Sequence, residues 1–188
     1  ATNENNVLEE FFTTGIYRPR SAEDTLATSS PSMDISKASN LERFIWALLG
    51  PEAFVQRWAE LETTGTLDLR DQLPRLREEF GFVAGTSTHA DRLEAIRTVK
   101  ERSGRLIDPH TADGVTVALR VMEPGFPTLV METAKAAKFP QTVAEALGSE
   151  PETPDVVADL LARPQKVETI DNEEAPLRAL IEERALTR

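Results

Sequence analysis

Helical periodicity dominates this chain and limits its fold more than any other feature of the sequence. One stretch shows the pattern clearly, because its apolar residues recur at helical spacing: Leu41, Phe44, Ile45, Leu48 and Leu49. Such spacing is typical of an amphipathic helix with one buried face. The same criterion predicts helices over residues 7–15, 41–49, 52–62, 70–80, 88–103, 111–122, 140–147, 154–162 and 173–186. Only two or three short strands are predicted beside them.

The predicted strands are short, and each is followed by a helix. Residues 105–107 form one candidate strand, residues 128–131 form a continuous apolar run without alternation, and residues 80–85 fit a strand or an extended turn. An apolar run of this kind is typical of a parallel strand covered on both faces. Strand–loop–helix units indicate an α/β fold with a parallel sheet. So few strands make a poor sheet, so we expect the rest of the sheet to lie outside this chain.

Composition excludes several kinds of chemistry. The 188 residues include no cysteine, which excludes disulfides, thiolate catalysis and cysteine-based zinc sites. With 32 acidic against 21 basic residues the net charge is −11, so neither nucleic acid nor an anionic membrane is an expected partner. No apolar run is long enough to span a membrane and no leader opens the chain, so we expect a cytoplasmic protein. Because the chain begins with Ala1 instead of Met, we expect it to be processed or part of something longer.

Short polar residues gather in three segments at the ends of predicted elements: residues 29–40, 108–111 and 132–139. The first is a long irregular loop, and such loops are usually functional or disordered. The second and third each follow a predicted parallel strand, at the edge where open α/β sheets bind ligands. Both also precede a helix N-terminus, which favours anions. These segments are therefore the candidates for a binding site.

Each candidate residue also has a purely structural explanation. Thr111 would serve as a helix N-cap, and His110 is either a turn residue or the wall of a site. Lys138 fits a surface cation and His89 a solvated surface residue, while Thr133 would pack its methyl group at a strand end. Two histidines are too few for a multi-histidine metal site, and the sequence contains no phosphate loop or other strong catalytic motif.

Three stretches resemble the threonine synthase family in order and spacing: residues 3–12, the block of residues 29–43, and residues 133–139. In the last stretch the family's Thr-Ala-His-Pro-Ala-Lys-Phe motif is present as Thr-Ala-Lys-Ala-Ala-Lys-Phe, so Lys135 and Ala136 replace its His and Pro. The resemblance implies that residues 1–150 are the carboxyl-terminal part of a catalytic domain, with a helical insertion at about 41–102. A helical tail over residues 151–188 would follow.

This resemblance implies an enzyme that depends on pyridoxal 5'-phosphate (PLP). The implied fold is the tryptophan-synthase-like fold, fold type II, with its parallel sheet incomplete in this chain. A threonine synthase converts O-phospho-L-homoserine and water to L-threonine and phosphate. The family's Schiff-base lysine and glycine-rich phosphate loop lie in its N-terminal part, and neither motif occurs here. We therefore expect the chain to need the missing N-terminal part as a partner and to be inactive alone.

The resemblance also implies one cofactor contact. In the family the motif's Thr is positioned to hydrogen-bond the pyridine nitrogen, and this role carries over to Thr133, whose neutral hydroxyl can donate to an unprotonated ring nitrogen. We expect Ser30, Ser32, His110 and Lys138 to line the substrate cleft beside the cofactor. Two alternatives remain open. One is a stand-alone helical binding module derived from the enzyme. The other is a different fold type II enzyme, such as a threonine dehydratase or a cysteine-synthase-like protein, against which the block of residues 29–43 argues.

Overall fold

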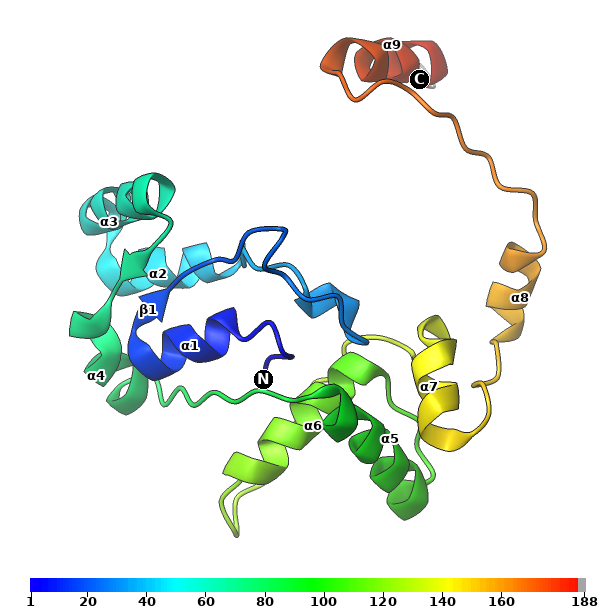
Figure 1. The fold of residues 1–188 in the computed structure, drawn as a ribbon, viewed down its shortest axis with the longest axis horizontal. Coiled ribbons are helices and arrows are strands. Elements are labelled where there is room, and N and C mark those ends of the chain that lie inside the picture. Colours follow the sequence, from blue (N-terminus) through cyan, green and yellow to red (C-terminus); the bar gives the residue numbers. More distant parts are fainter. Residues whose placement is uncertain (186–188) are drawn as a thin grey trace. The chain divides into compact units, whose positions relative to one another are not determined.

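The computed structural model describes residues 1–185, apart from the side chains of residues 156 and 161. The chain divides into two compact units, Ala1–Glu152 and Thr153–Arg188 (Figure 1). The first unit contains seven helices among its described residues: α1 (Val7–Thr14), α2 (Leu41–Leu49), α3 (Pro51–Thr64), α4 (Leu73–Glu78), α5 (His89–Ser103), α6 (Pro109–Val121) and α7 (Pro140–Leu147). The second unit contains α8 (Asp155–Leu161) and α9 (Glu174–Arg184). The predicted helices are thus confirmed, with small shifts of their ends.

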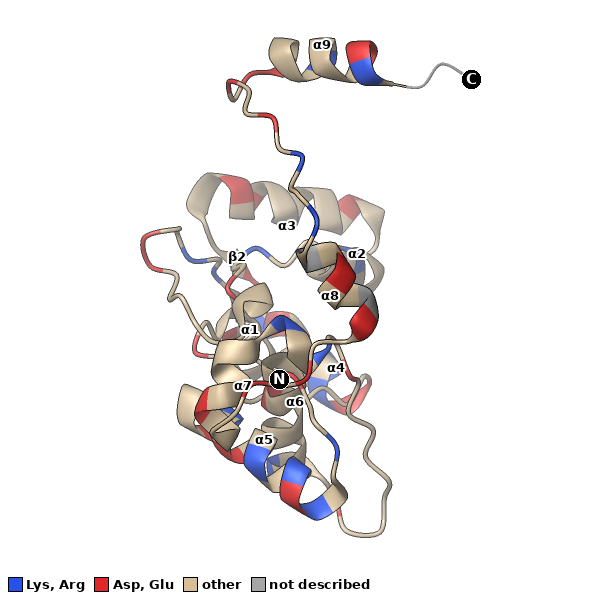
Figure 2. Ribbon diagram, turned by 90° about the vertical axis from the view of Figure 1, so that its right-hand side faces the viewer, with Lys and Arg blue, Asp and Glu red and all other residues tan. Residues whose placement is uncertain are grey.

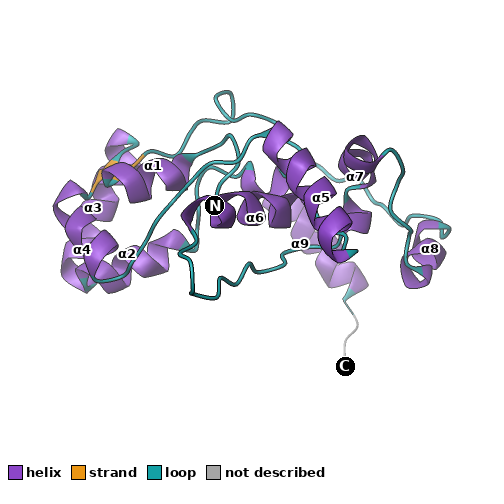
Figure 3. Cartoon of the chain, turned by 90° about the horizontal axis from the view of Figure 1, so that it is seen from below, coloured by secondary structure: helices purple, strands orange, loops and turns teal. Residues whose placement is uncertain are grey.

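Helices α1 to α4 surround one hydrophobic core. Its fully buried members come from all four helices and from two short strands, as Phe11, Ile45, Leu61, Leu67 and Leu76 show. The strands β1 (Ile16–Tyr17) and β2 (Leu67–Asp68) pair antiparallel, as Figure 3 shows in orange. The core is therefore assembled from amphipathic helix faces, as the periodicity predicts.

A second core holds α5, α6 and α7 together. Ala95, Ile96, Ala112 and Ala146 are its buried members, and Leu106 packs against them from the segment between α5 and α6. The start of α5 is fixed by a capping box in which Thr88 and Asp91 each accept a hydrogen bond from the other's backbone N–H. Both acidic and basic residues occur along α5, in red and blue in Figure 2. None of the described helices is long and apolar enough to cross a membrane.

The predicted strands over residues 105–107 and 128–131 are wrong for this chain, because both segments are irregular in the structure. Leu129 and Met131 are 88% and 77% exposed, instead of covered on both faces. A strand needs a neighbour for its backbone hydrogen bonds, and the described residues offer none to either segment. Parallel pairing among them is limited to the single bridge between Thr2 and Thr86. The chain is thus helix-rich, with the parallel sheet missing.

Candidate functional site

The N-terminus of α6 is built on a buried aspartate. Asp108 is the N-cap of this helix, Pro109 occupies the first helical position, and the Asp108 carboxylate accepts the backbone N–H of His110 at 3.0 Å. The hydroxyl of Thr111 donates to the other carboxylate oxygen of Asp108. Thr111 is therefore not the N-cap itself but a residue of the first turn that is bound to the N-cap.

His110 links this helix start to the loop of residues 29–34. Its Nδ1 lies 2.8 Å from Asp108 Oδ1, and its Nε2 lies 3.0 Å from the backbone nitrogen of Ser32. Because a backbone N–H can only donate, Nε2 accepts, and the ring proton must lie on Nδ1, facing the carboxylate. The ring is buried, and Phe139 packs edge-on against it at 4.8 Å between centroids. His110 is therefore a neutral ring with both nitrogens occupied.

Asp108 remains a carboxylate in these surroundings. Burial by itself would raise its pKa, but the hydrogen bonds from His110 and Thr111 outweigh that effect and lower the pKa below its usual value. The negative charge also lies at the N-terminus of α6, where the helix dipole favours it. The Asp108 carboxylate thus accepts hydrogen bonds from both His110 and Thr111 and holds the first turn of α6 in place.

Thr133 joins the same network through its backbone. Its N–H donates to the Thr111 hydroxyl oxygen at 3.2 Å, so a continuous hydrogen-bonded path runs from Ser32 through His110, Asp108 and Thr111 to Thr133. The Thr133 side chain is exposed, and its hydroxyl has no partner among the described residues. The structure thus holds the Thr133 backbone in place and leaves the side-chain hydroxyl available to a ligand.

The remaining predicted site residues have different positions. Ser30 is fully buried, and its hydroxyl and carbonyl lie 3.1 and 3.2 Å from the side-chain nitrogen of Asn3, so it supports the loop from inside. The Ser32 side chain is exposed and borders a hollow of about 340 Å³ between residues 1–8 and 32–40. Lys138 is exposed and makes no side-chain contact with the network within the described part of the chain. The structure brings together Ser32, His110 and Thr133 but not Lys138.

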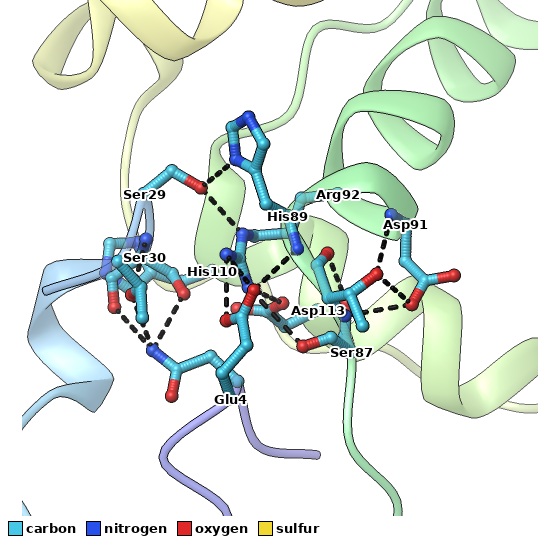
Figure 4. Close-up of polar contacts among 12 residues, drawn as sticks. Glu4, Ser29, Ser30, Ser87, His89, Asp91, Arg92, His110 and Asp113 are labelled. Carbon is cyan, nitrogen blue, oxygen red and sulfur yellow. Dashed lines mark hydrogen bonds and ion pairs between the residues drawn. The ribbon is translucent and has the colours of Figure 1, made fainter. Parts of the chain in front are cut away.

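A second polar network lies beside the first, and Figure 4 shows it around Arg92 of α5. This guanidinium is fully buried, and its Nη2 contacts both oxygens of Glu4 at 3.0 and 2.9 Å. Its Nη1 lies 3.0 Å from Oδ1 of Asp113 in α6, and its Nε donates to the Ser29 hydroxyl at 2.8 Å. One buried cation thus joins the N-terminal segment, the loop of residues 29–34, α5 and α6.

Asp113 is the least satisfied member of this network. Its Oδ2 atom is buried and has no hydrogen-bond partner among the described residues. Burial raises the pKa of its carboxyl, and polar neighbours including Arg92 offset this only in part. The single positive charge of Arg92 therefore faces two carboxyl groups of different burial, Glu4 and Asp113.

His89 is also part of the second network, instead of standing free on the surface. Its Nδ1 lies 2.8 Å from the Ser29 hydroxyl and its Nε2 lies 2.9 Å from Glu145 of α7. Because Arg92 already donates to Ser29, the serine hydroxyl is free to donate to Nδ1, which leaves the proton of the ring on Nε2, facing Glu145. The loop of residues 29–34 is therefore fastened to α5 through His89 and Arg92 and to α6 through His110.

Sequence reasoning placed Asp108 in a candidate segment without giving it a role, and it missed Arg92 and Asp113. A signal was present for the last two, because each charged residue stands four positions from a buried apolar residue on its own helix, Ile96 and Val117 respectively. A charge on the apolar face of a helix is rare unless it is paired. No signal in the sequence gives the partner, because Glu4 is 88 positions away from Arg92.

Comparison with known proteins finds similarity to one enzyme family. Residues 111–181 match the family model described as threonine synthase, C-terminal. The threonine synthase of Methylobacillus glycogenes is 48% identical over 97% of this chain and 39% of its own length, and that of Corynebacterium glutamicum is 49% identical over 92% of this chain and 37% of its own. The chain therefore spans less than half the length of these relatives.

The same family appears among solved structures. A PLP-bound threonine synthase from Brucella melitensis superimposes with a TM-score of 0.82 and 33% sequence identity, over 97% of this chain and 38% of that one. This similarity confirms the predicted fold class, because nearly the whole chain follows the backbone of part of a larger domain.

Proposed function

Because the chain belongs to the threonine synthase family, we propose that it forms the C-terminal portion of an enzyme that converts O-phospho-L-homoserine and water to L-threonine and phosphate. The observation that carries this proposal is Thr133, a residue with a fixed backbone and an available hydroxyl. It occupies the first position of the motif that resembles the family, in a chain about half identical to threonine synthases over most of its length.

The donor chemistry at Thr133 fits one end of PLP. An unpartnered neutral hydroxyl suits an unprotonated pyridine nitrogen, whereas a carboxylate in this place would hold the nitrogen protonated. The neighbouring Glu132 is paired instead with Lys135 at 2.7 Å. When bound, PLP supplies an electron sink for negative charge that develops on the substrate carbon. The phosphate-binding loop and the Schiff-base lysine would come from the N-terminal part of the enzyme.

Ser32 is the best-placed residue to line the substrate cleft. Its exposed hydroxyl borders the hollow of about 340 Å³, a size suited to a small ligand. Its backbone is anchored to His110, which fixes where the hydroxyl lies. In this proposal Ser30 and His110 hold the loop in place, and Lys138 stays a predicted cleft residue without a contact to the network among the described residues.

The exposed apolar residues Phe126, Leu129 and Met131 support the proposed partner, the N-terminal part of the same enzyme. They are 69%, 88% and 77% exposed, respectively, in a segment without backbone pairing. A contiguous apolar segment of this kind normally marks a surface that another part of the protein covers. We propose that residues 128–131 become a strand of the parallel sheet when the N-terminal part is present.

A chimeric enzyme tests the proposed function. The N-terminal part of the Methylobacillus glycogenes threonine synthase would be joined to this chain, and phosphate release from O-phosphohomoserine would be measured. We expect turnover by the chimera and none by the 188-residue chain alone. Phosphate release by the chain alone, or a folded chimera that binds PLP but not the substrate, would contradict the proposal.

Thr133→Val in that chimera tests the cofactor contact. The loss of one hydrogen bond in the reacting state should lower kcat roughly tenfold and change the visible absorption of bound PLP. Thr128→Val is the matched control, because it makes the same shape-conserving change five positions earlier in the segment, where valine suits the proposed strand. Equal activity and identical spectra for the two variants would show that Thr133 does not contact the ring.

A further inference from the structure

Helix α6 presents two residues of one face to the segment that carries Thr133. Thr111 accepts the Thr133 N–H at 3.2 Å. Three positions further along the helix is Gly114, where a Cβ atom would lie 3.0 Å from Cγ1 of Val130. A glycine inside a helix costs about 1 kcal/mol relative to alanine, and this close approach explains its presence. The segment is therefore seated on α6 at two points.

The hydroxyl of Thr111 has a fixed orientation. The side chain is buried, and its O–H donates to Asp108, which turns an oxygen lone pair toward the Thr133 N–H. Asp108 is itself held by the backbone N–H and the ring of His110. No rotation of the Thr111 side chain would keep both of its hydrogen bonds, so the position of the Thr133 backbone depends on this one hydroxyl.

We infer that Thr111 is a positioning residue for Thr133, with Asp108 orienting the Thr111 hydroxyl. The hydrogen bond sets the height of Thr133 above α6, and so the distance between the Thr133 hydroxyl and the cofactor ring. The effect of Thr111 on catalysis rests on the proposed function, because it requires that Thr133 contacts the cofactor ring. The hydrogen bond itself is a property of the chain without any cofactor, so it can be tested separately.

Hydrogen–deuterium exchange of the cofactor-free chain tests the hydrogen bond. The amide of Thr133 would be followed in wild type, Thr111→Val and Thr111→Ser. Valine keeps the shape but removes the acceptor, so exchange should become roughly fivefold to tenfold faster. Serine keeps the acceptor and should restore protection. Thr116→Val is the matched control, because Thr116 is on the same helix and is only partly buried. An unprotected amide in wild type, or equal exchange in all four proteins, would overturn the inference.

A double-mutant cycle in the chimeric enzyme tests the link to the cofactor. If Thr111 acts through Thr133, Thr111→Val should change the absorption of bound PLP in the same direction as Thr133→Val. It should also lower kcat more than it raises KM, and the double variant should be no worse than Thr133→Val. Thr111→Ser should retain both activity and spectrum.

The outcomes separate the two claims. Additive losses in the cycle, or an unchanged spectrum in Thr111→Val when Thr133→Val does change it, would overturn the positioning role alone. An unchanged spectrum in Thr133→Val would overturn the cofactor contact of the proposed function, whatever Thr111 does. Thermal melting of each variant by circular dichroism would show whether a loss of activity comes from unfolding. If Thr111→Val unfolds, Thr111→Ser tests the positioning role instead, because serine preserves the acceptor oxygen.

Discussion

Arg92 shows how much of this structure depends on single buried side chains. It is the only cation among the described members of the second network, and it links the N-terminal segment, the loop of residues 29–34 and α6 to its own helix α5. A buried ion pair adds little compared with an apolar core of the same shape, but breaking one leaves uncompensated charge. Removing Arg92 is therefore costly, although the intact network adds little net stability compared with apolar side chains of the same shape.

Arg92→Met should destabilise the chain strongly. It leaves Glu4 and Asp113 without their cation, so the free energy of unfolding should fall by about 3–5 kcal/mol. Arg97→Met is the control, because Arg97 is in the same helix but forms a partly exposed pair with Glu94, worth about 0–1 kcal/mol. Urea unfolding followed by circular dichroism measures both. Similar losses in the two variants would show that the Arg92 network is not a buried unit.

Asp108 should make the stability of the chain depend on pH. Its pKa is lowered in the folded state, so its contribution is complete above the unfolded-state pKa and is lost as pH falls through the folded value. Asp108→Asn should lower the free energy of unfolding by about 1–3 kcal/mol near neutral pH, and the difference from wild type should shrink below about pH 4. Urea titrations at several pH values would measure it; a difference that stays constant or grows in acid would contradict this reading.

At the scale of the elements, local signals were sufficient for helices and insufficient for strands. Periodicity and end signals gave α5 with its Thr88–Asp91 capping box and α7 with Gly148 after its last turn. Both depend on residues close in sequence. A strand depends on a partner that is distant in sequence. Residues 128–131 have no such partner among the described residues, so the strand predicted from their apolar run is wrong for this chain.

Gly15 ends α1 at a position where the structure has room for glycine and for no larger residue. It ends α1 with φ of +79°, and a Cβ atom there would lie 2.7 Å from the backbone Cα of Arg70. Gly15→Ala should therefore cost roughly 2–4 kcal/mol. Gly65→Ala is the control, because Gly65 has φ of +72° but open space around it, so only the backbone penalty of about 1 kcal/mol applies. Thermal unfolding would compare the stability losses of the two variants. Equal losses would show that the backbone near Arg70 moves away from the added Cβ atom at little cost.

The site was predictable in pieces but not as an assembly. Ser32, His110 and Thr133 were identified from polar residues at element ends and from the family resemblance, and the structure joins them in one hydrogen-bonded path. Asp108 joins them and lies in a candidate segment, but its role was not predicted. A single sequence does not show how many partners an N-cap carboxylate binds. The exposed position of Lys138 also depends on packing that the sequence does not give.

At the scale of the whole molecule, the chain has an apolar segment that its described residues leave uncovered. Leu129 and Met131 face solvent in the first unit, and Leu177 and Ile181 of α9 are exposed within the second. Large apolar side chains that are exposed together are typical of surfaces buried in a larger assembly. This agrees with a chain that spans less than half the length of its relatives.

Replacing Leu129 and Met131 with glutamate should leave the stability of the chain alone almost unchanged but prevent its assembly with the N-terminal part of the enzyme. Because both side chains are exposed in the chain alone, its free energy of unfolding should change by less than about 0.5 kcal/mol. In the chimeric enzyme the same change would place charges inside the completed sheet, and PLP binding and turnover should be lost. A chimera that keeps full activity with both glutamates would show that this segment is not the covered strand.

The state of the PLP ring nitrogen tests the central claim most directly. The chimeric enzyme would be loaded with PLP labelled at that nitrogen, and its nuclear magnetic resonance signal compared between wild type and Thr133→Val. We predict the signal of an unprotonated, hydrogen-bonded nitrogen, which moves toward that of a nitrogen without a hydrogen bond in the variant. A protonated nitrogen in wild type, or a signal that does not change in Thr133→Val, would contradict the contact on which the proposed function depends.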